Sequence, residues 1–141
     1  MSNLSAFIKP AYTEKKKEFV VSDRFVDEEG KPVPVVMRSL KQAELDDIAR
    51  RSTHDKKVDG RVVPQLDVNE HLNRCIIASM VFPDLTNSEL CRAHGTEDPV
   101  MLPSRLFMVG EYEKISKVFA ELNGLGEDDG KMRLPNEITK N

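Results

Sequence analysis

The spacing of the apolar residues changes near Ser39, and this change constrains the fold more than any other feature. From residue 18 to residue 38, apolar residues alternate with polar ones, as in a β-strand with one buried face. After Ser39 they recur every three or four residues, as along the buried side of an α-helix. Strands followed by helices predict an α+β fold, in which an N-terminal β-hairpin packs on a bundle of about four to five α-helices.

Residues 18–38 predict the β-hairpin. Asp27 and Gly30 suit its turn, because aspartate accepts backbone hydrogen bonds and glycine tolerates a positive φ. Pro34 lacks a backbone N–H and indicates an edge strand or a bulge. One face of the two strands carries Phe19, Val21, Phe25, Val33, Val35 and Met37. The other face is also partly apolar and is open to the N-terminal arm or to a partner; it carries Val20, Val26 and Val36.

The first helix is predicted to begin with Ser39 as its N-cap, with Gln42 completing a capping box. It ends near Arg51. Its buried stripe consists of Leu40, Ala43, Leu45 and Ile48. Residues 52–65 then lose all periodicity and predict a polar, mobile loop.

Two further helices follow this loop. The second begins at Asp67, with Glu70 in a capping box, and ends at Pro83. The third begins at Thr86, where Glu89 completes another box. The inner stripe of the second helix consists of Leu72, Cys75, Ile76, Ser79 and Met80. This stripe is widened by Ile77, Val81 and Phe82, so we expect the second helix to be the most buried one.

Residues 99–109 concentrate apolar side chains around two prolines. Pro99 suits the first position of a helix, whereas Pro103 falls inside it, so we expect a short, bent or broken helix. Core packing is the default interpretation. The alternative is an exposed, adaptable partner surface, because methionine side chains suit varied apolar contacts. The candidate partner-binding residues are Leu102, Leu106, Phe107 and Met108.

We expect one α+β domain over residues 18–125, preceded by an arm over residues 1–17 and followed by a disordered, charged tail over residues 126–141. The last helix of the domain runs from about residue 111 to residue 123. Apolar residues with helical spacing in the arm are Leu4, Phe7 and Ile8. They predict a short helical turn packed on the edge of the domain or, alternatively, an anchor for a partner. The expected core consists of Phe19, Phe25, Leu72, Ile76, Met80, Phe119 and Leu122.

Two pairs of residues have the spacing of zinc ligands. His71 and Cys75 lie one helical turn apart, as do Cys91 and His94, so each pair would offer a thiolate and an imidazole. Cys75 also falls on the apolar stripe of its helix, where cysteine acts as a small hydrophobe. We therefore favour buried thiols and expect no metal and no cofactor. The chain carries no glycine-rich phosphate loop, and we expect neither enzymatic activity nor a catalytic residue.

Charge and hydropathy narrow the classes of partner. The net charge is -3, and acidic and basic residues are interspersed, which argues against a nucleic-acid surface. No apolar run reaches the roughly 18 residues of a membrane span, and no signal peptide is evident. The simplest expectation is a cytoplasmic protein.

Several short segments recur in the order and spacing of a known family. They are Leu4-Ser5-Ala6-Phe7, Phe19-Val20-Val21-Ser22-Asp23-Arg24-Phe25, Asp27-Glu28-Glu29-Gly30-Lys31-Pro32, Phe82-Pro83-Asp84-Leu85, Glu89-Leu90, Gly110-Glu111-Tyr112 and Glu121-Leu122-Asn123-Gly124. From about Leu4 to Leu125, the chain resembles the XkdN-like phage tail assembly chaperones of PBSX-type prophages. It departs from the family pattern at Val109, where the family often has proline. The Cys and His pairs are not part of that pattern either, which further disfavours zinc.

The resemblance implies function by binding. Such chaperones coat the long, helical tape measure protein, whose apolar faces stay exposed until the tail tube forms, and help to recruit major tail protein subunits. The implied partners are therefore the tape measure protein and the major tail protein, with a homo-oligomer also considered, and no nucleic acid or membrane. The implied location is the cytoplasm of the bacterial host, not the mature virion. The alternative function is a small prophage regulatory or DNA-binding protein, although the chain has no basic recognition helix.

Overall fold

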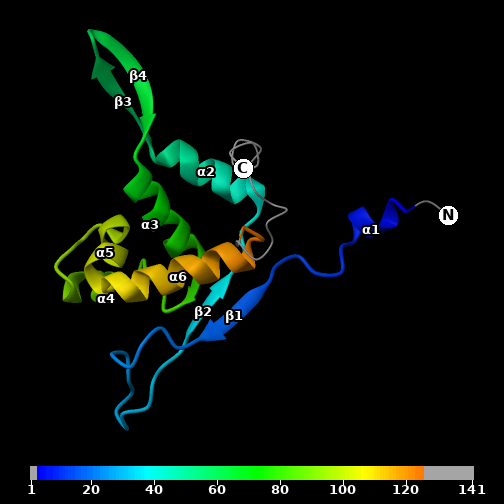
Figure 1. Cartoon of the computed structure of the whole chain (residues 1–141), viewed down its shortest axis with the longest axis vertical. Coiled ribbons are helices and arrows are strands. Elements are labelled where there is room, and N and C mark those ends of the chain that lie inside the picture. The colour runs from blue at the N-terminus through cyan, green and yellow to red at the C-terminus, as the bar shows by residue number, and fades with distance from the viewer. Residues whose placement is uncertain (1–2, 126–141) are drawn as a thin grey trace, which may run out of the picture.

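The computed structural model describes residues 3–125, and its α+β fold is the predicted one. A small antiparallel sheet packs against helices, while a two-stranded ribbon and a short N-terminal helix stand away from this body (Figure 1). The predicted tail, residues 126–141, lies outside the described residues. The elements are, in order, α1 (Ser5–Ile8), β1 (Lys16–Phe19), β2 (Val35–Arg38), α2 (Gln42–Arg51), β3 (Thr53–Val58), β4 (Arg61–Leu66), α3 (Val68–Ser79), β5 (Met80–Phe82), α4 (Ser88–Ala93), the 3-10 turn η1 (Pro99–Met101), α5 (Leu102–Leu106) and α6 (Val109–Leu122).

The predicted β-hairpin is formed by β1 and β2, which pair antiparallel with Phe19 opposite Val35. Its strands are shorter than predicted, and residues 20–34 form a long connection between them. β1 also begins early, so that Lys16 and Lys17, which we assigned to the arm, lie in the sheet. Two side chains of this connection, those of Ser22 and Arg24, contact Glu111 at the start of α6.

The turn within this connection has the predicted chemistry. Asp27 Oδ1 accepts hydrogen bonds from the backbone N–H groups of Glu29 and Lys31, at 2.8 and 2.9 Å. Gly30 has a φ of +80°, a conformation that glycine adopts without strain. The turn is therefore held by its own side chain and by one glycine, and it needs no support from the core.

The third strand of the sheet was not predicted. α3 ends at Ser79, before the predicted end at Pro83, and β5 follows and pairs with the free edge of β2. Val81 and Phe82 favour an extended backbone, and a third strand stabilises a hairpin that would be marginal alone. The prediction of a helix up to Pro83 was wrong because the last apolar residues, Met80–Phe82, fit the spacing of a strand as well as that of a helix.

The prediction of a mobile loop over residues 52–65 is wrong. The chain there forms β3 and β4, which are exposed along their whole length and project from the body as a ribbon (Figure 1). Asp59 and Gly60 form the two-residue turn at its tip, with φ of 52° and 79°. Both positive values match the turn that suits the twist of a β-hairpin. Neither face of the ribbon is buried, so the sequence shows no apolar alternation.

The predicted N-caps have mixed outcomes. Asp67 caps α3, because its carboxylate accepts the backbone N–H of the residue three positions on. Ser39 does not cap α2, whose N-cap is Lys41. α4 is capped by Asn87 rather than by the preceding Thr86. In both wrong cases the chosen hydroxyl residue lies just outside the helix that it was expected to start.

The core lies between the sheet, α3, α5 and α6. Its fully buried large side chains include Met37, Leu85, Leu102 and Ile115. Of the predicted core, Ile76 and Met80 are buried, and the partly buried members that pack against the core are Phe19, Phe25, Phe119 and Leu122. Leu72 is 44% exposed, so its place in the predicted core is wrong. α3 instead buries the neighbouring Asn73, whose amide bonds to Val100 and Tyr112.

α6 is the longest helix of residues 3–125, and it packs across β1 and β2. Its end follows the glycine-terminated pattern in which the next residue bonds back to the helix. Gly124 has a φ of +72°, and the Leu125 N–H donates to the Ala120 carbonyl at 2.7 Å. Within residues 3–125, no helix has the length and apolar character needed to cross a bilayer.

Candidate protein-binding surfaces

Residues 99–109 fold as a broken helix. Pro99 opens η1, and α5 follows with Pro103 in its first turn. Three of the four candidate partner-binding residues are buried in the core, and these are Leu102, Leu106 and Phe107. Met108, at the N-cap of α6, is 60% exposed. The exposure expected of a partner surface is therefore found at Met108 alone of the four, while binding by this segment stays a prediction.

An ion pair ties the long connection between β1 and β2 to the start of α6. Glu111 is 7% exposed, and its carboxylate accepts Arg24 Nε at 2.9 Å and Arg24 Nη2 at 2.7 Å. The Ser22 hydroxyl and the Met108 N–H donate to the same carboxylate, and Arg24 also donates to the Leu106 carbonyl. Such a bidentate ion pair fixes the relative orientation of the two side chains as well as their distance. The Arg24 hydrogen bonds hold the pKa of Glu111 down at about 2.

Acidification is expected to lower the free energy of unfolding by protonating Glu111. Its folded-state pKa of about 2 lies below the ordinary 4.5, so the unfolded chain takes up this proton first. The stabilisation is complete above about pH 4.5 and is lost as the pH falls toward 2, at up to about 1.4 kcal/mol per pH unit. Urea unfolding of the wild type and of Glu111→Gln through this window checks the expectation. The variant should lose less stability on acidification, and equal losses would contradict the assignment.

One candidate surface is an apolar hollow, the apolar groove, with a volume of about 340 Å³. It is lined by Arg24, Phe25, Val26, Val33, Pro34, Val35, Phe82, Pro83, Leu90, Leu106 and Phe107. The rings of Phe25 and Phe107 meet edge to face, with centroids 6.0 Å apart. Phe82 and Val26 are about half exposed on its walls. Two of the predicted partner-binding residues, Leu106 and Phe107, thus form part of its floor.

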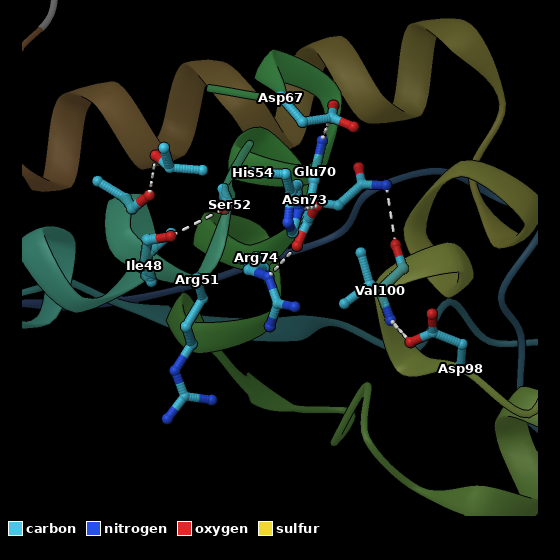
Figure 2. A network of polar contacts seen from close by, with 12 residues as sticks. Ile48, Arg51, Ser52, His54, Asp67, Glu70, Asn73, Arg74, Asp98 and Val100 are labelled. Atoms are coloured by element: carbon cyan, nitrogen blue, oxygen red, sulfur yellow. Dashed lines mark hydrogen bonds and ion pairs between the residues drawn. The ribbon is translucent and has the colours of Figure 1, made fainter. Parts of the chain in front are cut away.

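A second hollow, the helical groove, lies between α2, α3 and η1 and has a volume of about 460 Å³. Its lining residues are Asp47, Ile48, Arg51, Arg74, Ile77, Ala78, Thr86, Asp98, Pro99 and Val100. Figure 2 shows Arg51 and Arg74 on the neighbouring helices, with Asp98 and Val100 across from them. The groove therefore has an apolar floor and a rim that carries charges of both signs.

Polar contacts hold the elements around the helical groove (Figure 2). Asn73 Nδ2 on α3 donates to the Val100 carbonyl at 2.9 Å and so fixes η1. Glu70 accepts Arg74 Nε at 2.9 Å and lies 2.6 Å from His54 Nε2 at the base of the ribbon. The His54 hydrogen bond, followed by that of Arg74, lowers the pKa of Glu70. The groove is therefore built on regular elements whose relative positions are fixed by side chains.

The N-terminal arm is a third candidate surface. α1 forms the short helical turn that the sequence predicts, but Phe7 is 81% and Ile8 74% exposed. Figure 1 shows α1 standing away from the sheet and the other helices. The expected packing on the edge of the domain is therefore wrong. The alternative interpretation, an anchor for a partner, stays a prediction.

The cysteines occupy the core. Cys75 and Cys91 are both buried, and Cys91 Sγ donates to the Leu85 carbonyl at 3.7 Å. Burial raises the pKa of the Cys75 thiol, which opposes the thiolate that zinc would need. In the part of the chain that the structure describes, no three His, Cys, Asp or Glu side chains come together as a metal site. The two zinc-like pairs of the sequence are thus not brought together there.

Comparison with known proteins decides the family. A family model described as phage XkdN-like tail assembly chaperone protein matches residues 4–137. The chain belongs to this family. From Bacillus subtilis (strain 168), the uncharacterised protein YqbN is 34% identical over 127 residues, covering 87% of this chain and 85% of YqbN. The phage-like element PBSX protein XkdN of the same strain is 32% identical over 127 residues, covering 87% of this chain and 86% of XkdN.

A solved structure of one of these relatives has the same fold. The crystal structure of YqbN matches this fold with a TM-score of 0.71 at 30% identity, covering 88% of this chain and 98% of that one. The family is one of phage tail assembly chaperones, so it favours a role in binding tail proteins over the alternative of a prophage regulator.

The helical groove of this family member was not predicted from the sequence. Ile48 and Ile77 were assigned to buried helix stripes, and Val100 to the apolar segment, without any reason to bring them together. One signal was present: the stripe of α3 is wider than one packed face requires, because it includes Ile77. A helix with such a wide stripe has apolar surface left over after it has packed on the core.

Proposed function

We propose that this tail assembly chaperone binds the tape measure protein of its phage or prophage, keeps it soluble, and helps to recruit major tail protein subunits. Membership of the family supports a role in tail assembly. The helical groove is the observation that supports binding of the tape measure protein. The role consists of binding and release, with no catalytic step, in the cytoplasm of the host. On this proposal the chaperone leaves before the virion is complete.

The helical groove suits an amphipathic helix. The apolar face of such a helix would lie on Ile48, Ile77 and Val100, with its polar flanks against the charged rim. Tape measure proteins, as the resemblance implies, offer long helices of this kind. A groove that recognises the helical period of apolar residues, rather than one sequence, can accept many successive segments of the same chain.

The 99–109 segment contributes to this proposal in two places. Pro99 and Val100 line the helical groove, and the exposed Met108 offers a flexible apolar contact. Of the other candidate residues, Leu102 is fully buried in the core and offers no surface to a partner. The segment therefore presents its ends to a partner and its middle to the core.

Filling the helical groove tests the proposal. Ala78 lines the groove on α3 and is partly exposed. In Ala78→Arg, the long side chain can lie along the groove with its charge in water, so the fold should survive. We expect Ala78→Arg to bind purified tape measure fragments about tenfold or more weakly, as measured by calorimetry or pull-down. Ala93→Arg on α4, outside the groove, is the matched control and should bind as the wild type does.

Two results would count against the proposal. If folded Ala78→Arg binds tape measure fragments as tightly as the control does, the helical groove is not the site. If the wild type itself captures no tape measure fragment, the tape measure is not the partner. Thermal melts of both variants establish that any loss of binding is not a loss of fold.

A further inference from the structure

We propose that α1 of one molecule docks in the apolar groove of a second copy of this chain, so that Phe7 and Ile8 complete the lining of that groove. This contact uses a different surface from the helical groove and does not depend on the tape measure proposal.

The arm has the properties of a segment that is ordered by a partner. Phe7 and Ile8 are 81% and 74% exposed, on a helix of only four residues. So short a helix is unstable alone in water, because few hydrogen bonds offset the cost of starting it. Burial of its apolar face is the contribution that is missing, and the body of the same molecule does not provide it (Figure 1).

The apolar groove has the space and chemistry to receive these side chains. Its volume of about 340 Å³ is roughly twice that of a cavity of about 150 Å³ that accepts a benzene ring. Phe82 and Val26 remain about half exposed on its walls, so an inserted ring would bury them as well. An aromatic side chain inserted in a preformed apolar pocket is the usual centre of a stable protein contact.

Charge favours the same pairing. Lys9 follows α1 directly, while Glu28 and Glu29 lie in the turn just after Val26 of the groove. None of these three side chains makes an ion pair within residues 3–125. With α1 in the groove, Lys9 would approach this acidic turn. The helical groove, by contrast, carries Arg51 and Arg74 together with Asp47 and Asp98 on its rim, so its charge does not favour Lys9 in the same way.

The direction of the chain favours a second copy over the molecule's own groove. α1 precedes the Lys16 end of β1, whereas the 20–34 connection that walls the groove follows the Phe19 end. Figure 1 shows α1 and that connection beyond opposite ends of β1. An arm that continues outward meets a neighbour, and two different surfaces in contact generate either a reciprocal exchange or a head-to-tail assembly.

Sedimentation velocity of the full chain, over micromolar to millimolar concentrations, tests the docking. We expect the wild type to associate with increasing concentration. Phe7→Asp removes the arm's anchor and Phe82→Asp changes the groove wall, and each should weaken association about tenfold or more. Val26→Asp provides a second groove variant, should Phe82→Asp fold poorly. Val109→Asp is the control, because Val109 is 85% exposed and lines neither groove, and it should associate as the wild type does.

Mixing the variants gives the decisive result. Phe7→Asp keeps an intact groove and Phe82→Asp keeps an intact arm, so an equimolar mixture should form a heterodimer that neither variant forms with itself. A strictly monomeric wild type, unchanged association of Phe7→Asp, or a mixture that stays monomeric would each overturn the proposal. Arm-to-arm pairing would appear as association of Phe82→Asp alone at wild-type strength, and that outcome rejects the groove as the docking site.

Discussion

Phe107→Asp is expected to prevent folding. Phe107 is 8% exposed, and its ring packs edge to face on Phe25 at the floor of the apolar groove. An aspartate there would place a carboxylate among apolar side chains without a cationic partner of its own, since Arg24 is already engaged by Glu111. An unpaired buried charge costs several kcal/mol, a large part of the roughly 5–15 kcal/mol by which a whole domain is stable.

Met108→Asp is the matched comparison. It introduces the same carboxylate at the neighbouring position, where the side chain is 60% exposed. We expect Met108→Asp to remain soluble and to melt cooperatively, whereas Phe107→Asp should aggregate or show no cooperative melt by circular dichroism. A well-folded Phe107→Asp would show that this side chain is not part of the core and would restore it as a free partner surface.

Ile76→Ala is expected to lower the free energy of unfolding by about 2–5 kcal/mol. Ile76 is 3% exposed on α3 and belongs to the core cluster, so truncation removes apolar contacts and leaves a cavity that rigid neighbours cannot fill. Urea unfolding monitored by circular dichroism measures the change directly, provided that the transition stays two-state.

Leu72→Ala, on the same helix, supplies the control. Both residues belong to the apolar stripe that the sequence predicts, but Leu72 is 44% exposed. Its truncation should change the free energy of unfolding by less than about 1 kcal/mol. Equal losses for the two variants would mean that α3 is rotated relative to its position in this structure.

The helices and the first hairpin could be predicted because burial imposes a period on the sequence. α6 and the body of α3 each pack one face on the core, so their apolar residues recur with helical spacing in the sequence. The prediction that Leu72 is buried was wrong, because apolar spacing shows which side of a helix faces the core but not how far the buried face extends. The helix instead buries Asn73, whose amide bonds to Val100 and Tyr112.

The ribbon formed by β3 and β4 could not be predicted from periodicity, because a strand exposed on both faces has no apolar alternation. Its local signal was Asp59-Gly60, a strong turn pair between residues that favour strands, such as Val58 and Val62. That signal is independent of burial. It indicates a hairpin even where the flanking residues are polar.

The candidate sites were less accessible to prediction. Leu102, Leu106 and Phe107 are equally compatible with a core segment and with a partner surface, and only their neighbours in space decide between the two. Each groove is also assembled from residues far apart in the chain, such as Phe25 with Phe107. One sequence without its relatives does not reveal which of these segments meet.

The length of the projecting ribbon formed by β3 and β4 can change without changing the rest of the fold. Its base is fixed, because the Asp67 N–H donates to the Ser52 carbonyl and His54 bonds to Glu70, while every residue of its strands is exposed. One residue added to each strand would extend its reach by about 3.3 Å without disturbing a core contact. Insertions and deletions in this ribbon would therefore change its reach without changing the packing of the core.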